Sequence, residues 1–160
     1  MIQTDKKYKV IYADPPWYFK SYSKKGEGRN ATQHYNCMSI DDICNLDISG
    51  VVSDDCVLLM WVTDPFLLDA FKVIQSWGFT YKTVGFTWIK TNQKSLGYFT
   101  GMGYWTRSNP EMCLLATKGK PKRLNKSTKQ LVVSERREHS RKPDEMYGYI
   151  ENMLEGPYLE

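Results

Sequence analysis

The chain has 160 residues, of which 41% are hydrophobic and 25% charged, and its net charge is +4. This size and balance predict one folded domain, residues 1–160, with a single core. Its cysteines form no C-x-x-C pair and its histidines lie far apart, so we expect no metal site and a reducing compartment. Without a basic-then-apolar leader or an apolar run of membrane-spanning length, we expect an intracellular, cytoplasmic protein outside the membrane.

Apolar runs alternate with helical segments along the chain. The runs predict strands over residues 9–13, 57–62, 81–90, 111–117 and 130–134, and the start of a last strand at 157–159. One short helix is expected to begin after Ser39 as its N-cap, a second to run from Asp64-Pro65 to Gly78, and a third to cover residues 143–154. This alternation indicates an α/β layered sheet that binds ligands at the carboxyl ends of its strands.

The most informative segment is Asp14-Pro15-Pro16-Trp17, which directly follows the first predicted strand. Two successive prolines fix the backbone and remove two donors, so the carbonyls of Asp14 and Pro15 can accept hydrogen bonds from a ligand. An acidic group, rigid acceptors and a large aromatic side chain suit an aromatic amine such as that of adenine. The alternative is a stiff turn whose aspartate caps a neighbour and whose tryptophan belongs to the core.

Two further segments are compatible with nucleic-acid binding. Residues 18–36 are rich in Lys, Gly, Ser, Asn and Tyr and predict a long mobile loop. Residues 118–142 contain ten basic residues against Glu135 and Glu138, which predicts a stretch that faces phosphates. A solvated surface is the alternative for this stretch. Residues 97–103 are glycine-rich, but no helix clearly follows them, so we expect a loop there and not a dinucleotide fingerprint.

The order of these segments resembles the MT-A70 family of adenine-N(6) methyltransferases, and the resemblance spans almost the whole chain. It rests on Tyr-Ala-Asp-Pro-Pro-Trp at 12–17, His34-Tyr35-x-x-Met38-Ser39, Gly103-Tyr104-Trp105-x-Arg107, Glu111-x-x-Leu114, Lys118-Gly119-Lys120-Pro121, Ser-Arg-Lys-Pro-Asp-Glu-Met-Tyr at 140–147, and Pro157-Tyr158-Leu159-Glu160. The tetrapeptide alone is moderately specific, whereas the ordered set is highly specific.

The resemblance implies the Rossmann-like fold of S-adenosylmethionine-dependent methyltransferases, with a mostly parallel central sheet and helices on both faces. It also implies S-adenosylmethionine as the cofactor and transfer of its methyl group to the exocyclic N(6) amine of adenine. We expect DNA as the substrate, because a single small domain without an appended RNA-binding module suits the compact bacterial or viral members, which work in a cytoplasm.

The same resemblance assigns roles to three groups of residues. The catalytic group is Asp14, Pro15, Pro16 and Trp17, with Trp17 able to stack on the base. The substrate-binding group is Tyr35, Arg107, Asn109, Glu111 and Lys142. The cofactor-binding group is Asp14, Pro15, Lys142 and Glu160. From the residues alone, Tyr35 is equally well explained as a packed loop aromatic, and Lys142 as a solvated cation. Glu111 precedes an apolar strand, where a carboxylate seldom serves packing alone.

In one respect the chain departs from the family. The strand beginning at Leu159-Glu160 continues, in the family, into residues that hold the ribose and methionine parts of the cofactor. We therefore expect the chain to lack the final cofactor-binding elements. The functional alternatives are the same reaction on RNA adenine, a catalytically silent nucleic-acid-binding subunit, or a plain binding module. A homodimer or heterodimer is an alternative to a monomer.

Overall fold

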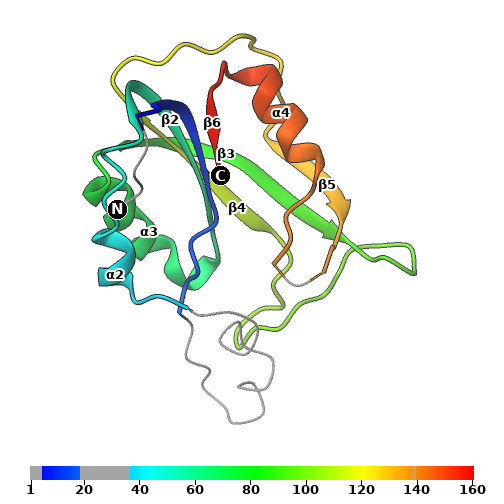
Figure 1. Cartoon of the computed structure of the whole chain (residues 1–160). Coiled ribbons are helices and arrows are strands. Elements are labelled where there is room, and N and C mark those ends of the chain that lie inside the picture. The colour runs from blue at the N-terminus through cyan, green and yellow to red at the C-terminus, as the bar shows by residue number, and fades with distance from the viewer. Residues whose placement is uncertain (1–4, 19–36, 139) are drawn as a thin grey trace.

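The computed structural model describes residues 5–18, 37–138 and 140–160, and Figure 1 shows the arrangement of their helices and strands around one sheet. The sheet has six strands in the order β5-β3-β4-β2-β1-β6. The strands are β1 (Tyr8–Ala13), β2 (Val52–Val62), β3 (Thr80–Thr91), β4 (Glu111–Lys118), β5 (Leu131–Glu135) and β6 (Tyr158–Leu159). The helices are α2 (Ile40–Cys44), the 3-10 turn η2 (Asp64–Phe66), α3 (Leu67–Ser76) and α4 (Glu145–Met153).

Helices cover both faces of the sheet, as expected, with α2 and α3 on one side and α4 on the other (Figure 1). Successive side chains of a strand point to opposite faces, so β2 feeds two cores. Leu58 and Met60 pack with Ile74 of α3 on one face. Leu59 and Trp61 pack with the α4 side on the other. This explains why β2 is an unbroken apolar run rather than an alternating one.

The sheet is mixed, which corrects the expectation of a mostly parallel sheet. Strand β1 runs parallel to β2 and β6, and β3 runs parallel to β5. Strand β4 runs antiparallel to both β2 and β3. The reason is the connection between β3 and β4: residues 92–110 include no helix, and without a helical crossover the chain returns antiparallel to the strand it has left.

The predicted helix boundaries follow from local chemistry. The Ser39 hydroxyl accepts a hydrogen bond from the backbone N–H of Asp42 at 3.1 Å, as an N-cap of α2 should. Pro65 lies in the η2 turn, so the regular helix α3 begins two residues later than predicted. Gly78 follows α3 with φ of +81°, a conformation that favours glycine after a helix.

Strands β1 and β2 deliver their carboxyl ends to one edge of the sheet. Ala13 at the end of β1 is in register with Met60, and Met112 near the start of β4 is in register with Val62. Asp14 and Glu111 therefore emerge at this same edge, although 97 positions separate them in the sequence. Among the described residues, no helix is both long and apolar enough to cross a membrane.

Candidate active site

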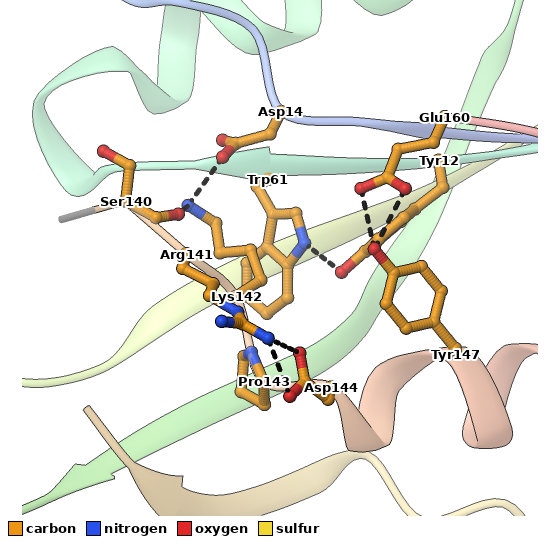
Figure 2. A pocket seen from close by; sticks show the side chains of 10 residues that line it. All are labelled: Tyr12, Asp14, Trp61, Ser140, Arg141, Lys142, Pro143, Asp144, Tyr147 and Glu160. Atoms are coloured by element: carbon orange, nitrogen blue, oxygen red, sulfur yellow. Dashed lines mark hydrogen bonds and ion pairs between the residues drawn. The ribbon is translucent and has the colours of Figure 1, made fainter. Parts of the chain in front are cut away.

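Asp14 and Lys142 meet at the carboxyl end of β1 (Figure 2). The Lys142 ammonium lies 2.9 Å from Asp14 Oδ2 and 3.2 Å from Glu111 Oε2, so one cation is shared by two carboxylates. Its side chain is 14% exposed, and its ammonium lies 5.4 Å from the centre of the Trp61 ring. Residues from β1, β4 and the segment before α4 thus converge on one point.

A second lysine extends this group into a row of alternating charges. The Lys90 ammonium at the end of β3 lies 2.6 Å from Glu111 Oε1, while Lys142 holds the other oxygen of the same carboxylate. The side chains of Lys90 and Glu111 are 16% and 18% exposed. Removing one partner would leave a largely buried charge without its pair, so each group depends on the presence of the other.

The pKa values in this row are shifted in different directions. Burial raises the pKa of the Asp14 carboxyl above its usual range, and the nearby Lys142 ammonium only partly offsets this. Burial also acts to raise the pKa of Glu111, but Lys142 and Lys90 outweigh it and hold the value below its usual range. For Lys142, burial acts to lower the pKa, but Glu111 and Asp14 outweigh it and raise the value. Solvent still screens Asp14, whose side chain is 40% exposed.

A hollow of about 340 Å³ opens beside Asp14 and Lys142, with aromatic side chains on one wall. The Tyr12 hydroxyl accepts a hydrogen bond from the Trp61 indole at 2.7 Å, which fixes both side chains. The Tyr147 hydroxyl donates to the Glu160 carboxylate at 2.9 Å (Figure 2). The hollow therefore combines flat aromatic surfaces with three carboxylates, those of Asp14, Asp144 and Glu160.

The two prolines and Trp17 make a rigid turn after β1. The backbone N–H of Trp17 donates to the Pro15 carbonyl at 2.8 Å, so that carbonyl keeps only part of its accepting capacity for a ligand. The Pro16 carbonyl accepts from the N–H of Met38 at 2.9 Å, which ties the turn to the segment before α2. The Pro15 carbonyl is therefore less available to a ligand than the sequence predicts, because it already accepts one hydrogen bond from Trp17.

Trp17 lies in the core and not against the hollow. Its side chain is 6% exposed, stacks on the Phe66 ring at 5.8 Å, and donates its indole N–H to the carbonyl of Trp61 at 3.2 Å. It belongs to the core on the α2 and α3 side, whereas Tyr12 and Trp61 face the α4 side. Because the ring is buried and already stacked on Phe66, this placement favours the alternative of a core tryptophan over stacking on a base.

Asn109 and Arg107 lie outside the hollow. Asn109 pairs with both backbone groups of Lys90, at 2.9 Å each, and also donates to the carbonyl of Phe99 at 2.6 Å. It thereby fixes the backbone that carries Lys90. Arg107 is exposed and donates to the carbonyl of Gly103 at 3.4 Å. Tyr35 lies outside the described residues.

The basic stretch 118–142 does not form one surface beside the hollow, which corrects the expectation of a single phosphate-facing segment. Lys118 is in register with Cys56, near the amino-terminal part of β2, whereas Met112 is in register with Val62. Since β4 runs away from Asp14, residues 118–125 lie at the opposite end of the sheet, and the chain then returns until Leu131 is in register with Thr87 of β3 (Figure 1). Arg141 and Lys142 return to the hollow.

Several residues of the site carry no signal in the sequence. Lys90 reaches Glu111 only because Trp88 pairs with Glu111 across β3 and β4. In the sequence, Tyr12 and Trp61 look like ordinary residues of apolar strands. The only available signal is that successive side chains of a strand point to opposite faces, which could have placed both residues on the same face of the sheet. Tyr147 lies one turn after Pro143, which places it beside the hollow.

The chain is similar to known methyltransferases. The MT-A70 family matches residues 8–159. The type II methyltransferase M.MunI of Mycoplasma sp is 36% identical over 155 residues, covering 86% of this chain and 64% of that protein. The human N(6)-adenosine-methyltransferase catalytic subunit METTL3 is 32% identical over 152 residues, covering 94% of this chain and 24% of that protein. A similar N(6)-adenosine-methyltransferase MT-A70-like protein of Arabidopsis thaliana is 33% identical over 147 residues, covering 91% of this chain and 20% of that protein.

Proposed function

The chain belongs to the MT-A70 family, and we propose that it transfers the methyl group of S-adenosylmethionine to the exocyclic N(6) amine of adenine in DNA. The observation that carries this proposal is the Asp14 carboxylate, held at the edge of the hollow by Lys142 at 2.9 Å. A carboxylate at a strand's carboxyl end, next to a rigid carbonyl, can accept hydrogens from an amine that gathers positive charge.

The residues around the hollow fit S-adenosylmethionine. The hollow has a volume of about 340 Å³, which falls within the range of small-molecule sites, roughly 300–1,000 Å³. The cofactor carries a sulfonium cation and ribose hydroxyls, for which the carboxylates of Asp14 and Glu160 are suitable partners. Tyr12 and Trp61 supply the apolar wall. When bound, the cofactor supplies an electrophilic methyl group and leaves as a neutral thioether.

Asp14 has the central role in this mechanism. The lone pair of the adenine amine is delocalised into the ring, so the amine is a weak nucleophile until its nitrogen becomes tetrahedral. The Asp14 carboxylate and the remaining lone pair of the Pro15 carbonyl accept the two amine hydrogens and favour that geometry. As the amine nitrogen accepts the methyl group and gathers positive charge, both hydrogen bonds would strengthen. The methylated amine then releases one proton to Asp14 or to solvent.

Lys142 adjusts the charge on Asp14. In the structure the ammonium pairs with Asp14 and Glu111 together. When an amine approaches Asp14, Lys142 can keep its pairing to Glu111 and release part of its hold on Asp14. Lys90 keeps Glu111 oriented during this exchange, since it holds the other carboxylate oxygen. Lys90 is therefore a positioning residue.

A substrate adenine has to leave the base stack before it can reach this site, because the amine of a paired base is not accessible. RNA adenine is the second candidate substrate, and the similarity to N(6)-adenosine-methyltransferases such as METTL3 favours it. Similarity to M.MunI, a type II methyltransferase, favours DNA. A homodimer, a heterodimer and a silent binding subunit are the further alternatives, and intact Asp14 argues against the last.

Transfer of a labelled methyl group to DNA and RNA oligonucleotides, tested in parallel, decides between these functions. Digestion to nucleosides identifies the product. We expect label in N(6)-methyldeoxyadenosine and little in the RNA product. Label confined to N(6)-methyladenosine would select the RNA alternative. A protein that binds S-adenosylmethionine and both polymers but labels neither would contradict the enzyme proposal and favour the binding subunit.

A further inference from the structure

The residues that join β4 to β5 carry a second cluster of positive charge, far from the hollow. We call residues 118–130 the distal basic loop; its cations are Lys118, Lys120, Lys122, Arg123, Lys126 and Lys129, and it contains no acidic residue. All of these side chains except the half-buried Lys118 are exposed. In Figure 1 the loop is the yellow segment at one end of the sheet, and β1 ends at the other.

The distal cations lack the acidic partners that neutralise the cations near the hollow. Arg141 pairs with Asp144 at 3.0 Å, and Arg137 lies 3.9 Å from the same carboxylate. By contrast, among the described residues, no carboxylate forms an ion pair with any cation of the distal basic loop. The loop therefore presents its positive charge to solvent.

Hydrogen bonds hold the loop in a defined position against the end of α4. The N–H of Leu124 donates to the carbonyl of Met153 at 2.8 Å, and the Asn125 amide donates to the carbonyl of Asn152. These two carbonyls belong to the last turn of α4, where helical carbonyls need outside donors. At the other end of the loop, the N–H of Lys120 donates to Asp55 at 2.7 Å. The cations are thus displayed on an ordered backbone.

The lengths of helix α4 and strand β4 give two estimates of the distance between the loop and the hollow, because each element runs from one to the other. The nine residues of α4, Glu145–Met153, rise about 13 Å as a helix. The seven steps from Glu111 to Lys118 extend about 23 Å as a strand. At 3.4 Å per nucleotide along a strand, this range corresponds to roughly 4–7 nucleotides. A polymer engaged at the hollow could therefore reach the loop within one helical turn.

We propose that the distal basic loop is a second binding site for the phosphodiester backbone of the nucleic-acid substrate, several nucleotides from the adenine that enters the hollow. This inference rests on the proposed function. The cations of the distal basic loop form no part of the site around Asp14. They would therefore contribute to the affinity for nucleic acid and leave the rate of the chemical step unchanged. Each phosphate contact steepens the salt dependence of binding, with a slope of about 0.9 per contact for duplex DNA.

Direct binding measurements test the proposal without relying on turnover. Fluorescence anisotropy would follow a labelled duplex of about 20 base pairs, and a single-stranded RNA of similar length, across a series of salt concentrations. The test variant is Lys122→Gln/Lys126→Gln, and the matched control is Lys7→Gln/Lys72→Gln, which removes two exposed charges elsewhere. Thermal unfolding would establish that both variants fold like the wild type.

We expect the test variant to flatten the salt slope by about 1.8 on duplex DNA, or by about 1.4 if single-stranded RNA is the preferred polymer, and the control to leave it unchanged. The kcat of methyl transfer at saturating substrate should stay at the wild-type value. A wild-type slope in the test variant, or equal flattening in the control, would overturn the proposal while leaving the proposed function intact. Failure of the wild-type protein to bind either polymer would instead overturn both.

Discussion

Lys142 is shared between two carboxylates, and this sharing makes the site depend on residues that touch no substrate. Lys90 holds Glu111 at 2.6 Å, and Glu111 holds Lys142 at 3.2 Å, so Lys90 acts on Asp14 through two intermediates. The register of β3 against β4 brings Lys90 to Glu111, and the sequence alone does not reveal that register. The positions of Asp14 and Glu111 could be predicted, because Asp14 directly follows an apolar strand and Glu111 begins one.

Replacing Lys90 with Met should weaken the site from a distance. The change leaves one oxygen of the buried Glu111 carboxylate without its partner, which we expect to cost about 1–3 kcal/mol in free energy of unfolding. Denaturant unfolding measures this loss. Methyl transfer should fall through kcat, and Lys90→Arg should restore part of both. Equal effects of Lys94→Met, an exposed lysine near the end of β3, would argue against a specific positioning role.

The ion pairs of Glu111 predict how stability depends on pH. Because its pKa is lower in the folded protein than its usual value near 4.5, Glu111 contributes stability that is present above that value and is lost as pH falls below it. Lys142 has a raised pKa, so its contribution is present below its usual value of 10.5 and is lost as pH rises past it. The two groups therefore protect the fold between these limits.

Unfolding curves of the wild type and Glu111→Gln measured across pH test this sign. The difference in free energy of unfolding between the two proteins should be constant near pH 7 and shrink on the acid side. A difference that grows with acidity would mean that the pKa of Glu111 is raised in the folded protein, contrary to the paired arrangement.

At the scale of elements, the turn after β1 owes its position to the core. Trp17 anchors the turn through the Phe66 ring and the Trp61 carbonyl, and the Pro16 carbonyl ties it to Met38. The alternation of polar and apolar residues could not predict on which side of the sheet Trp17 lies, because two prolines interrupt the alternation. Helix caps were easier: the Ser39 cap of α2 depends only on residues within one turn.

Variants of Trp17 separate anchoring from base stacking. Trp17→Ala should lower the free energy of unfolding by about 3–5 kcal/mol, because it removes a buried aromatic side chain. Trp17→Phe should lose mainly the indole hydrogen bond and retain methyl transfer with an unchanged KM for nucleic acid. The contrary pattern, a raised KM with full stability in Trp17→Ala, would support stacking on the base.

At the scale of the whole molecule, the sheet has a hydrophobic core on each of its two faces. The apolar runs were sufficient to predict the strands and an α/β fold, but not the direction of β4. That direction depends on a long connection without a helix, and it carries the distal basic loop away from the hollow. Counting basic residues along the sequence therefore cannot show which of them lie near the hollow and which lie at the other end of the sheet.

The reactivity of the four cysteines tests this two-sided core. Cys56 faces the α2 and α3 side and Cys113 the α4 side, and both are 0% exposed. Burial raises the pKa of the Cys56 thiol to about 11 and that of Cys113 above its usual range. A thiol reagent should therefore label the half-buried Cys37 and Cys44 first. Mass spectrometry would locate the label; early modification of Cys113 in the native protein would contradict a closed core on the α4 side.

The proposed methyl transfer to adenine depends most directly on the Asp14 carboxylate. The most direct test compares kcat for label transfer by the wild type, Asp14→Asn and Asp54→Asn, with Asp54 serving as an exposed aspartate on β2. We expect kcat of Asp14→Asn to fall by about 10²–10³, as for loss of one transition-state partner, with folding retained and Asp54→Asn unaffected. Wild-type kcat in a folded Asp14→Asn protein would mean that the Asp14 carboxylate takes no part in the transfer.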